Sequence, residues 1–258
     1  MNPVKSLIAR HQNKTLKNFY KTKYGQIIKS FKDKHKGKRC FVLGNGPSLS
    51  AADLNRLKSA DEITFATNRV FKIFEQTDWR PTYYVSEDEL ILKDTQADVN
   101  KMKAFAKFVP IQLKYYHDIN IDGAVYFNLN YDSEDRCKYN FSPDFAAKAE
   151  ATGTVTITCL QLAAYMGFSE IYLLGVDHNF SKIIDENGNE IIDNTVKDYF
   201  VDGYDDDVKS QVVHDLGTTT KGYQNAKNFC DENGIKVFNA TRGGKLEVFK
   251  RADFDSLF

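Results

Sequence analysis

Short apolar runs alternate with helical patterns along most of the chain. Six runs are predicted to be strands: Arg39–Leu43, Glu62–Ala66, Thr82–Ser86, Ala124–Asn128, Glu170–Gly175 and Ile235–Asn239. Helical patterns lie between several of them, over Ser48–Lys58, Val155–Met166 and Thr219–Asn233. Strands as short and apolar as these are buried on both faces. The alternation therefore predicts an α/β fold with a doubly wound, mostly parallel sheet.

Residues 3–34 precede the first strand and show one long helical pattern. Its apolar positions are Val4, Leu7, Ile8, Leu16, Tyr20, Tyr24, Ile27, Ile28 and Phe31. Basic residues recur from Lys5 to Arg39, and Asp33 is the only acid among them. Such a helix either lies on an anionic membrane surface or packs on the main domain or a partner subunit. We expect a basic leader over residues 1–36 and a catalytic domain over 37–258.

Two long segments of the main domain, 129–150 and 181–218, are polar, aromatic and irregular. Long connections of this kind in an α/β domain are usually lids or substrate loops, so 181–218 is predicted to be a lid.

Composition narrows the class of protein. The chain has 258 residues, 42% of them hydrophobic, which is enough for one large core or two small ones. Its formal net charge is zero, which argues against a nucleic-acid-binding protein. The cysteines (Cys40, Cys137, Cys159 and Cys230) are scattered without a zinc spacing, as in a reducing cytoplasm. We expect no signal peptide and no transmembrane helix.

Polar residues follow the predicted strands at their carboxyl ends, where open parallel sheets bind ligands. The first strand runs into Gly44-Asn45-Gly46-Pro47-Ser48. Glycines let a backbone approach a phosphate closely, and the first N–H groups of the next helix lack partners, so this turn is a candidate phosphate site. The alternative is an ordinary strand-to-helix turn, which has the same pattern. The other ends are Thr67-Asn68-Arg69, Ser86-Glu87-Asp88, Asp177-His178-Asn179 and 239–244, and Thr152-Gly153-Thr154 opens a helix. We expect several of them to face one crevice.

Four segments in this order resemble a known family. Gly-Asn-Gly-Pro-Ser-Leu at 44–49, Asn68, and 171–177 after an alanine-rich helix are similar to bacterial family 42 sialyltransferases. They are more similar to the wider 6-hydroxymethylpterin pyrophosphokinase-like family (domain of unknown function 115), which includes motility accessory factors. The run 234–249 is typical of that wider family. The resemblance covers roughly residues 38–254 and implies a Rossmann-like fold, a variant of the GT-A type.

The resemblance also implies which residues bind a donor, because in the sialyltransferases the glycine turn and the amides after it hold cytidine monophosphate. The implied donor contacts are Gly44, Asn45, Gly46, Ser48, Asn68, Ser86, Thr152, Gly153 and Thr154. The segment 152–156 departs from the sialyltransferase pattern because it has no arginine, and the tyrosines that steady the leaving phosphate lack a clear counterpart. A CMP-sugar remains the favoured donor.

Glycosyl transfer needs a base for the acceptor hydroxyl and a positive environment for the departing phosphate. His214 lies near the place of the sialyltransferase histidine and is the first candidate for the base, followed by His178 with Asp177 beside it. Arg242, among glycines after the last strand, is a candidate phosphate contact. Glu87 and Asp88 are further acids at a strand end and offer a carboxylate base instead.

Three functions are open at this point. The first is a glycosyltransferase that moves a sugar, such as a sialic-acid-like or other 2-keto sugar, from a nucleotide donor to a glycan hydroxyl. It would act in bacterial surface polysaccharide or glycoprotein synthesis and require no metal. The second is an ATP-dependent diphosphokinase of a hydroxymethylpterin-like molecule, which would use Mg²⁺. The third is a non-catalytic scaffold on a membrane surface.

The expected location is the cytoplasm. The leader, residues 1–36, is expected to mediate peripheral contact with the inner face of the cell membrane or the formation of a homo-oligomer.

Overall fold

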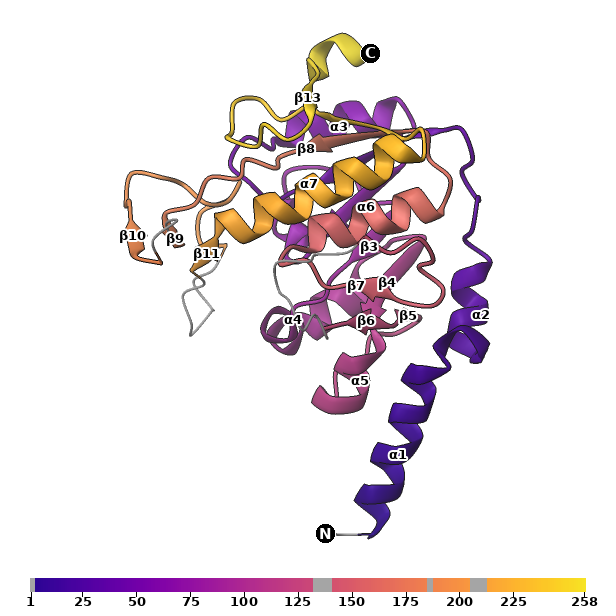
Figure 1. The fold of residues 1–258 in the computed structure, drawn as a ribbon. Coiled ribbons are helices and arrows are strands. Elements are labelled where there is room, and N and C mark those ends of the chain that lie inside the picture. The colour runs from indigo at the N-terminus through magenta and orange to yellow at the C-terminus, as the bar shows by residue number, and fades with distance from the viewer. Residues whose placement is uncertain (1–2, 132–140, 185–187, 205–212) are drawn as a thin grey trace.

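A computed structural model of the chain describes residues 3–131, 141–184, 188–204 and 213–258 (Figure 1). Its main sheet has eight strands in the spatial order β13-β12-β8-β1-β2-β3-β4-β5, and all paired neighbours are parallel. The strands are β1 (Arg39–Leu43), β2 (Thr64–Thr67), β3 (Tyr83–Val85), β4 (Ala106–Pro110), β5 (Val125–Phe127), β8 (Glu170–Leu174), β12 (Lys236–Asn239) and β13 (Lys250–Arg251).

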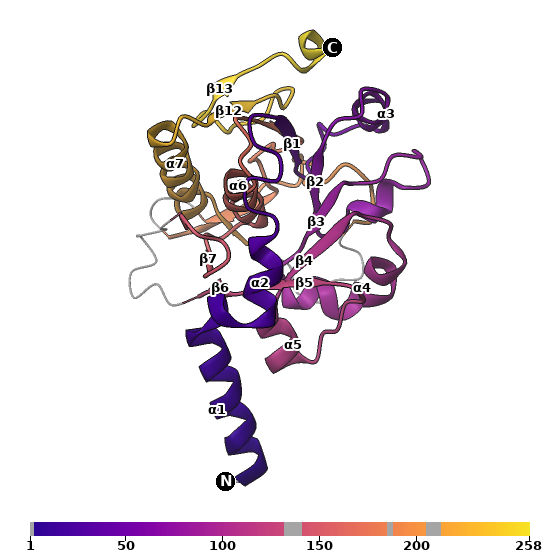
Figure 2. The ribbon, with the colours of Figure 1, turned by 90° about the vertical axis from the view of Figure 1, so that its right-hand side faces the viewer.

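Helices cover both faces of this sheet (Figure 2). On one face lie α6 (Val155–Tyr165) and α7 (Leu216–Glu232), and on the other lie α3 (Ala51–Ser59) and α4 (Glu89–Lys101). The predicted α/β fold with a doubly wound, parallel sheet is therefore confirmed.

The strand order places a topological switch point between β1 and β8. From β1 the chain builds the sheet outward to β5, then crosses back through α6 to β8 on the opposite side of β1. Connections on the two sides of this point diverge, which leaves a crevice beyond the carboxyl ends of the two strands.

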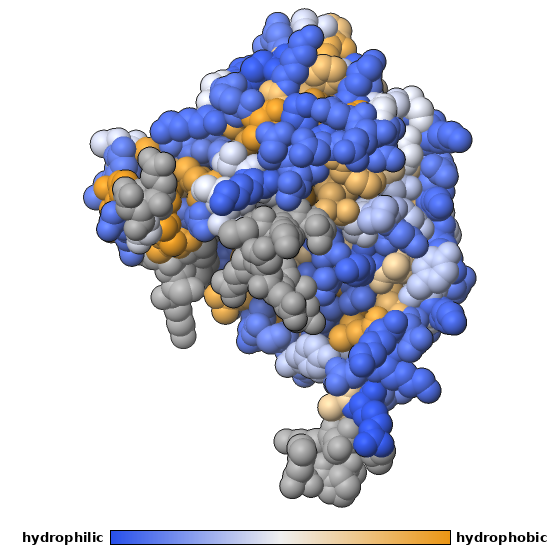
Figure 3. Space-filling model, in the orientation of Figure 1, coloured by the Kyte–Doolittle hydropathy of each residue, from blue (hydrophilic) through white to orange (hydrophobic). Residues whose placement is uncertain are grey.

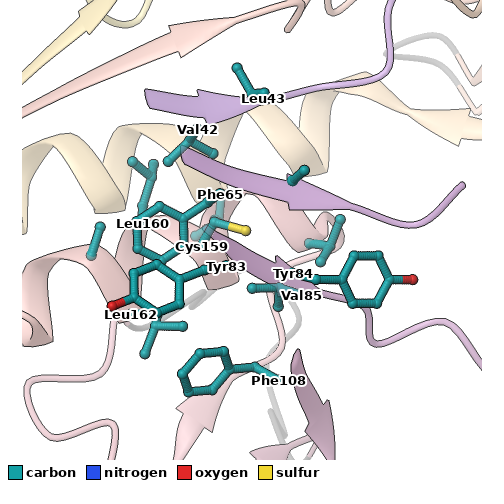
Figure 4. Close-up of a cluster of buried hydrophobic side chains, with 14 of the residues drawn as sticks. Val42, Leu43, Phe65, Tyr83, Tyr84, Val85, Phe108, Cys159, Leu160 and Leu162 are labelled. Atoms are coloured by element: carbon teal, nitrogen blue, oxygen red, sulfur yellow. The ribbon is translucent and has the colours of Figure 1, made fainter. Parts of the chain in front are cut away.

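The core lies where the central strands meet α6 (Figure 4). Val42, Phe65 and Leu160 are fully buried in this cluster. The sequence of α6 is apolar all round and lacks charged residues, so this helix is buried nearly throughout, as a helix without a polar face requires.

Smaller elements surround the main sheet. The segment predicted to be an irregular lid contributes β9 (Lys182–Ile184), β10 (Glu190–Ile192) and β11 (His214–Asp215), which form a second sheet. Strands β6 (Leu129–Asn130) and β7 (Ala149–Glu150) form a third, and α5 (Ile111–His117), η2 (Val70–Ile73) and η3 (Phe254–Leu257) complete the fold. Cys137 and part of the predicted lid (185–187 and 205–212) lie outside the described residues.

The single helix predicted over residues 3–34 is wrong. The chain forms α1 (Pro3–Lys17), η1 (Phe19–Lys21) and α2 (Lys23–Lys29), because Thr22 takes an extended conformation and caps α2 by accepting a hydrogen bond from Gly25 N. Helix α1 projects from the body of the molecule in both ribbon views (Figures 1 and 2).

The second half of this leader belongs to the main core. Phe19, Ile28 and Phe31 are buried, and the Phe31 ring lies 5.1 Å from that of Phe108 on β4. Apolar side chains of the leader thus cover the β5 end of the sheet, which would otherwise be exposed to water.

The surface in the orientation of Figure 1 is mostly hydrophilic (Figure 3). Hydrophobic side chains gather on it around β9 and β10, where Ile191 and Ile192 are exposed. No helix in the described ranges is long and apolar enough to cross a membrane.

The packing of α2 leads to a prediction about stability. Ile28→Ala should lower the free energy of unfolding by about 2–5 kcal/mol, since it removes a fully buried side chain from the core. Ile27→Ala is the matched control, because Ile27 is 46% exposed on the same helix. Equal losses from the two variants in urea unfolding would contradict the assignment of α2 to the core.

Candidate functional site

A cavity of about 280 Å³ lies at the switch point, beyond the carboxyl ends of β8, β1, β2 and β3. The turns after these strands line it with Gly44, Asn45, Gly46, Asn68, Glu87, Asp88, Asp177 and His178. The start of α6 adds Gly153 and Thr154, and the lid region adds Phe180, Asp198, Tyr199, Tyr204 and His214. Most of the residues predicted for the site therefore converge on one cavity.

The glycine turn after β1 packs against the turn after β8. Gly44 N donates to Leu174 O and Gly46 N donates to Gly175 O, both at 2.9 Å. A Cβ at Gly44 would lie 2.3 Å from Gly175 O, and one at Gly46 would lie 2.0 Å from the Asp177 carboxylate. These glycines are needed for the close approach of the two turns as well as for any approach to a ligand.

Ser50 and Asp53 form a capping box at the start of α3, in which Asp53 N donates to Ser50 Oγ and Ser50 N donates to the Asp53 carboxylate. These two N–H groups are therefore already paired. Ser48, predicted as a donor contact, does not line the cavity. Its hydroxyl donates to Asp177 Oδ2 at 2.7 Å, so its function in the structure is to hold that carboxylate.

The side-chain amides of Asn45 and Asn68 line the cavity. Each amide is hydrogen-bonded at one of its two ends. Asn45 Nδ2 donates to Thr67 O at 3.1 Å, whereas its buried Oδ1 has no hydrogen-bond partner in the described part of the chain. Asn68 Oδ1 accepts from Ser86 Oγ at 3.1 Å, and no described residue bonds to its Nδ2. Asn68 has φ of 50°, a left-handed conformation that turns its side chain at the strand end. Ser86 itself is fully buried outside the cavity and acts by orienting Asn68.

The start of α6 faces the same cavity. Gly153 and Thr154 line it, and Thr154 caps the helix by accepting a hydrogen bond from Thr156 N. The adjacent Thr152 is buried behind this wall, and its hydroxyl has no partner among the described residues. The positive end of the α6 dipole therefore points toward the cavity, although Thr152 does not reach it.

Asp177 and His178 follow β8. Burial raises the pKa of Asp177, and the hydrogen bonds from Ser48 oppose this shift. His178 Nε2 lies 2.8 Å from Thr220 Oγ1, and burial, together with the nearby His214, lowers its pKa. Thr220 is therefore the bonded partner of the His178 imidazole.

His214 lies in β11 and not in the irregular loop predicted for it. Its ring stacks on Phe180 with centroids 3.6 Å apart, and burial lowers its pKa. A histidine with a lowered pKa is neutral at pH 7 and able to accept a proton.

The described part of the lid is fixed to the strand ends. Phe200 N donates to Asn45 O at 3.0 Å. Tyr204 accepts at its hydroxyl from Arg69 N (3.1 Å) and at its carbonyl from Arg69 Nη1 (2.8 Å). Tyr199 stacks on Tyr204 with centroids 4.0 Å apart, so two aromatic rings form one wall of the cavity.

The described cavity lining is acidic. It contains Glu87, Asp88, Asp177 and Asp198, and no lysine or arginine. Arg242, the predicted phosphate contact, lies outside the cavity because Asp53 and Asp255 pair with its guanidinium at 2.8 and 3.0 Å. The positive environment expected from the sequence is therefore not supplied by this arginine.

Glu87 is the most perturbed acid of the cavity. Burial raises its pKa to about 7, while the hydrogen bond from Thr158 Oγ1 (2.7 Å) opposes the shift and Asp88 adds to it. The sequence identified Glu87 only as one of two acids at a strand end. Its raised pKa was not foreseeable from the local sequence, because the burial that causes it comes from elements distant along the chain.

The described residues hold no group of three or more histidine, cysteine, aspartate or glutamate side chains placed to bind a metal ion. A divalent cation at this cavity would need ligands from a substrate phosphate or from water.

The fold defines an α/β protein with a cavity at the switch point of a parallel sheet. This chain belongs to the 6-hydroxymethylpterin diphosphokinase MptE-like family, whose model matches residues 13–182. The family resemblance stated from the sequence is thereby confirmed. No curated protein matches the chain.

The chain is also similar in fold to a solved structure, the MAf glycosyltransferase from Magnetospirillum magneticum AMB-1. The TM-score is 0.54 with 16% sequence identity over 91% of this chain. The match covers 38% of that protein, so this chain corresponds to a minor part of it.

The burial of Glu87 leads to a prediction about stability and pH. The native pKa of about 7 lies above the ordinary value of 4.5, so ionisation of Glu87 costs stability as the pH rises through this interval. Glu87→Gln should therefore stabilise the fold by about 2–3 kcal/mol at pH 8 and have little effect at pH 5. Urea unfolding of both proteins at the two pH values measures this difference. An equal gain in the free energy of unfolding at pH 5 and pH 8 would contradict the raised pKa of Glu87.

Proposed function

We propose that this protein is a glycosyltransferase that binds a nucleotide-activated sugar in the switch-point cavity and transfers the sugar to a hydroxyl group. The observation that carries the proposal is the pair of fixed amides, Asn45 and Asn68. Both line a cavity walled by aromatic rings, where Asn45 is fixed by its bond to Thr67 O and Asn68 by the bond from Ser86 Oγ. Ribose hydroxyls and base edges supply the complementary donors and acceptors.

The remaining walls suit the rest of such a donor. Tyr199, which stacks on the buried Tyr204, supplies a flat aromatic ring beside which a base or sugar ring would fit. The start of α6 offers a dipole of the sign that attracts phosphate. A CMP-sugar is the donor that the family 42 resemblance favours, and a glycan hydroxyl in surface polysaccharide or glycoprotein synthesis is the proposed acceptor.

A diphosphokinase is the second candidate, and two observations favour it. The matching family is described by this activity. The described lining also contains four carboxylates without a lysine or arginine, so ATP phosphates would enter as a magnesium complex. Asp177 would meet such an ion through Oδ1, because the hydrogen bonds from Ser48 go to its Oδ2. Dependence of nucleotide binding on Mg²⁺ distinguishes this candidate from a metal-independent glycosyltransferase.

The sequence-based assignment of His214 as the base, with His178 as its alternative, stays a prediction. Both line the cavity at its β8 end, both have lowered pKa values, and both are neutral at pH 7. We further propose that α1, with the basic residues around it, mediates peripheral membrane contact or self-association in the cytoplasm. A protein that bound liposomes and no nucleotide would fit the non-catalytic scaffold instead.

The amide pair gives a prediction about affinity. Asn45→Ala and Asn68→Ala should each weaken binding of the preferred nucleotide by about 1–3 kcal/mol, because each leaves a buried ligand group unpaired. The nucleotide is first chosen by thermal shift among CMP, UDP, GDP and ATP, with and without Mg²⁺. Calorimetry then measures the variants. Arg242→Gln is the control and should bind normally, and unchanged affinity in both asparagine variants would refute the site.

A further inference from the structure

A second pocket adjoins the cavity on the side of β3. Its walls come from the start of α4, from α5 and from the residue after β6, and they include Gln112, Tyr116, His117 and Tyr131. Glu87 lines this pocket and also the switch-point cavity. This carboxylate therefore stands on the boundary between the two spaces.

The carboxylate of Glu87 is held in a fixed orientation. Thr158 Oγ1 on α6 donates to Oε2 at 2.7 Å. The other oxygen, Oε1, receives no hydrogen bond from any residue in the described ranges. One oxygen anchors the group, and the second remains able to accept a proton from a bound molecule.

The second pocket has the chemistry of a sugar-binding site. Tyr116 and Tyr131 are 49% and 56% exposed, so their ring faces are open to a ligand. Gln112 is held by its bonds to Leu129 O (2.6 Å) and Asn128 Oδ1 (2.8 Å) and forms a rigid wall. His117 Nδ1 lies 2.8 Å from Glu89 Oε1, which adds a polar edge. Aromatic faces beside polar edges match the apolar faces and hydroxyl rim of a sugar ring.

The two candidate bases lie at opposite ends of the cavity. His178 follows β8 and Glu87 follows β3, and β1 and β2 lie between these strands. Three strand spacings separate the ends by about 14 Å. A donor bound across Asn45 and Asn68 lies between them, so an acceptor in the second pocket reaches it from the Glu87 end.

We propose that the second pocket binds the acceptor as a sugar ring and that Glu87 is the catalytic base that deprotonates its hydroxyl. This inference rests on the proposed glycosyltransferase function. In the reaction, the acceptor oxygen forms a bond to the anomeric carbon while the bond from that carbon to the nucleotide phosphate oxygen breaks. The phosphate retains the electron pair of the broken bond, and the acceptor proton passes to Glu87 Oε1.

The pH dependence of turnover separates Glu87 from His214. The titratable groups that face Glu87 are Asp88 beside it, Cys159 on α6, Tyr131, and the Glu89–His117 pair across the second pocket. In this setting burial raises the pKa of Glu87 to about 7, whereas burial lowers that of His214. A base must be deprotonated, so turnover should rise with pH through about 7 and then level off.

The test uses the full chain with its preferred nucleotide. Ligand-observed NMR measures binding of methyl glycosides of glucose, galactose and N-acetylglucosamine. At least one glycoside should bind, and Tyr131→Ala should weaken its binding about tenfold or more. Tyr20→Ala is the matched control, because Tyr20 is similarly exposed (43%) and lies outside the pocket. Failure of all three glycosides to bind, or equal binding of the bound glycoside to Tyr131→Ala and wild type, overturns the acceptor site.

Glu87→Gln tests the base. The variant should retain nucleotide and glycoside affinity but transfer sugar at least a hundredfold more slowly. Its residual turnover should no longer rise with pH near 7. Transfer at the wild-type rate in Glu87→Gln, or an inactive His214→Ala beside an active Glu87→Gln, overturns the assignment of Glu87. In both of these outcomes the protein still transfers sugar, so the proposed glycosyltransferase function is retained and only the role of Glu87 is refuted. If the wild type binds no nucleotide, the glycosyltransferase function itself is refuted.

Discussion

The contact between the turns after β1 and β8 is the constraint on which the site depends. Two backbone hydrogen bonds of 2.9 Å and the bond from Ser48 to Asp177 join these turns. The approach is so close that a Cβ at Gly44 or Gly46 would overlap the facing chain. Because β1 and β8 are adjacent strands with connections that diverge, this contact closes the base of the switch-point crevice and directs Asn45 and Asp177 toward its interior.

The site also shows how a fold tolerates groups that do not stabilise it. An unpaired amide oxygen on Asn45, a left-handed backbone at Asn68 and His178, and a buried carboxylate on Glu87 each cost free energy. All of them line one cavity, while the surrounding core is apolar and closely packed. In a functional site, a bound ligand supplies the missing partners of such groups.

The sequence predicts the fold well where burial alone determines structure. Every predicted strand corresponds to an observed one, because short apolar runs between turns are buried on both faces. Strand β4 was missed because its sequence contains Lys107, whose Nζ is satisfied by Asn100 O. Helices α4 and α5 were also missed. The leader was predicted as one helix because periodicity does not register the break at Thr22.

The candidate site was predictable in outline and not in detail. Polar strand ends locate the cavity, since parallel strands end at one edge of the sheet. Which groups enter it depends on pairs distant in sequence, such as Arg242 with Asp53 and Glu87 with Thr158. Local sequence contains no information about these pairs, so neither the pairing of Arg242 outside the cavity nor the second pocket beside Glu87 was predicted.

The central claim is that a nucleotide binds at the switch point between β1 and β8. Hydrogen–deuterium exchange of the full chain, with and without the nucleotide that stabilises it most, tests this claim most directly. The account predicts slower exchange in the turns at 44–48, 67–69 and 152–156, with little change in α5 or η3. Protection confined to other parts of the chain, with these three turns unaffected, would contradict it.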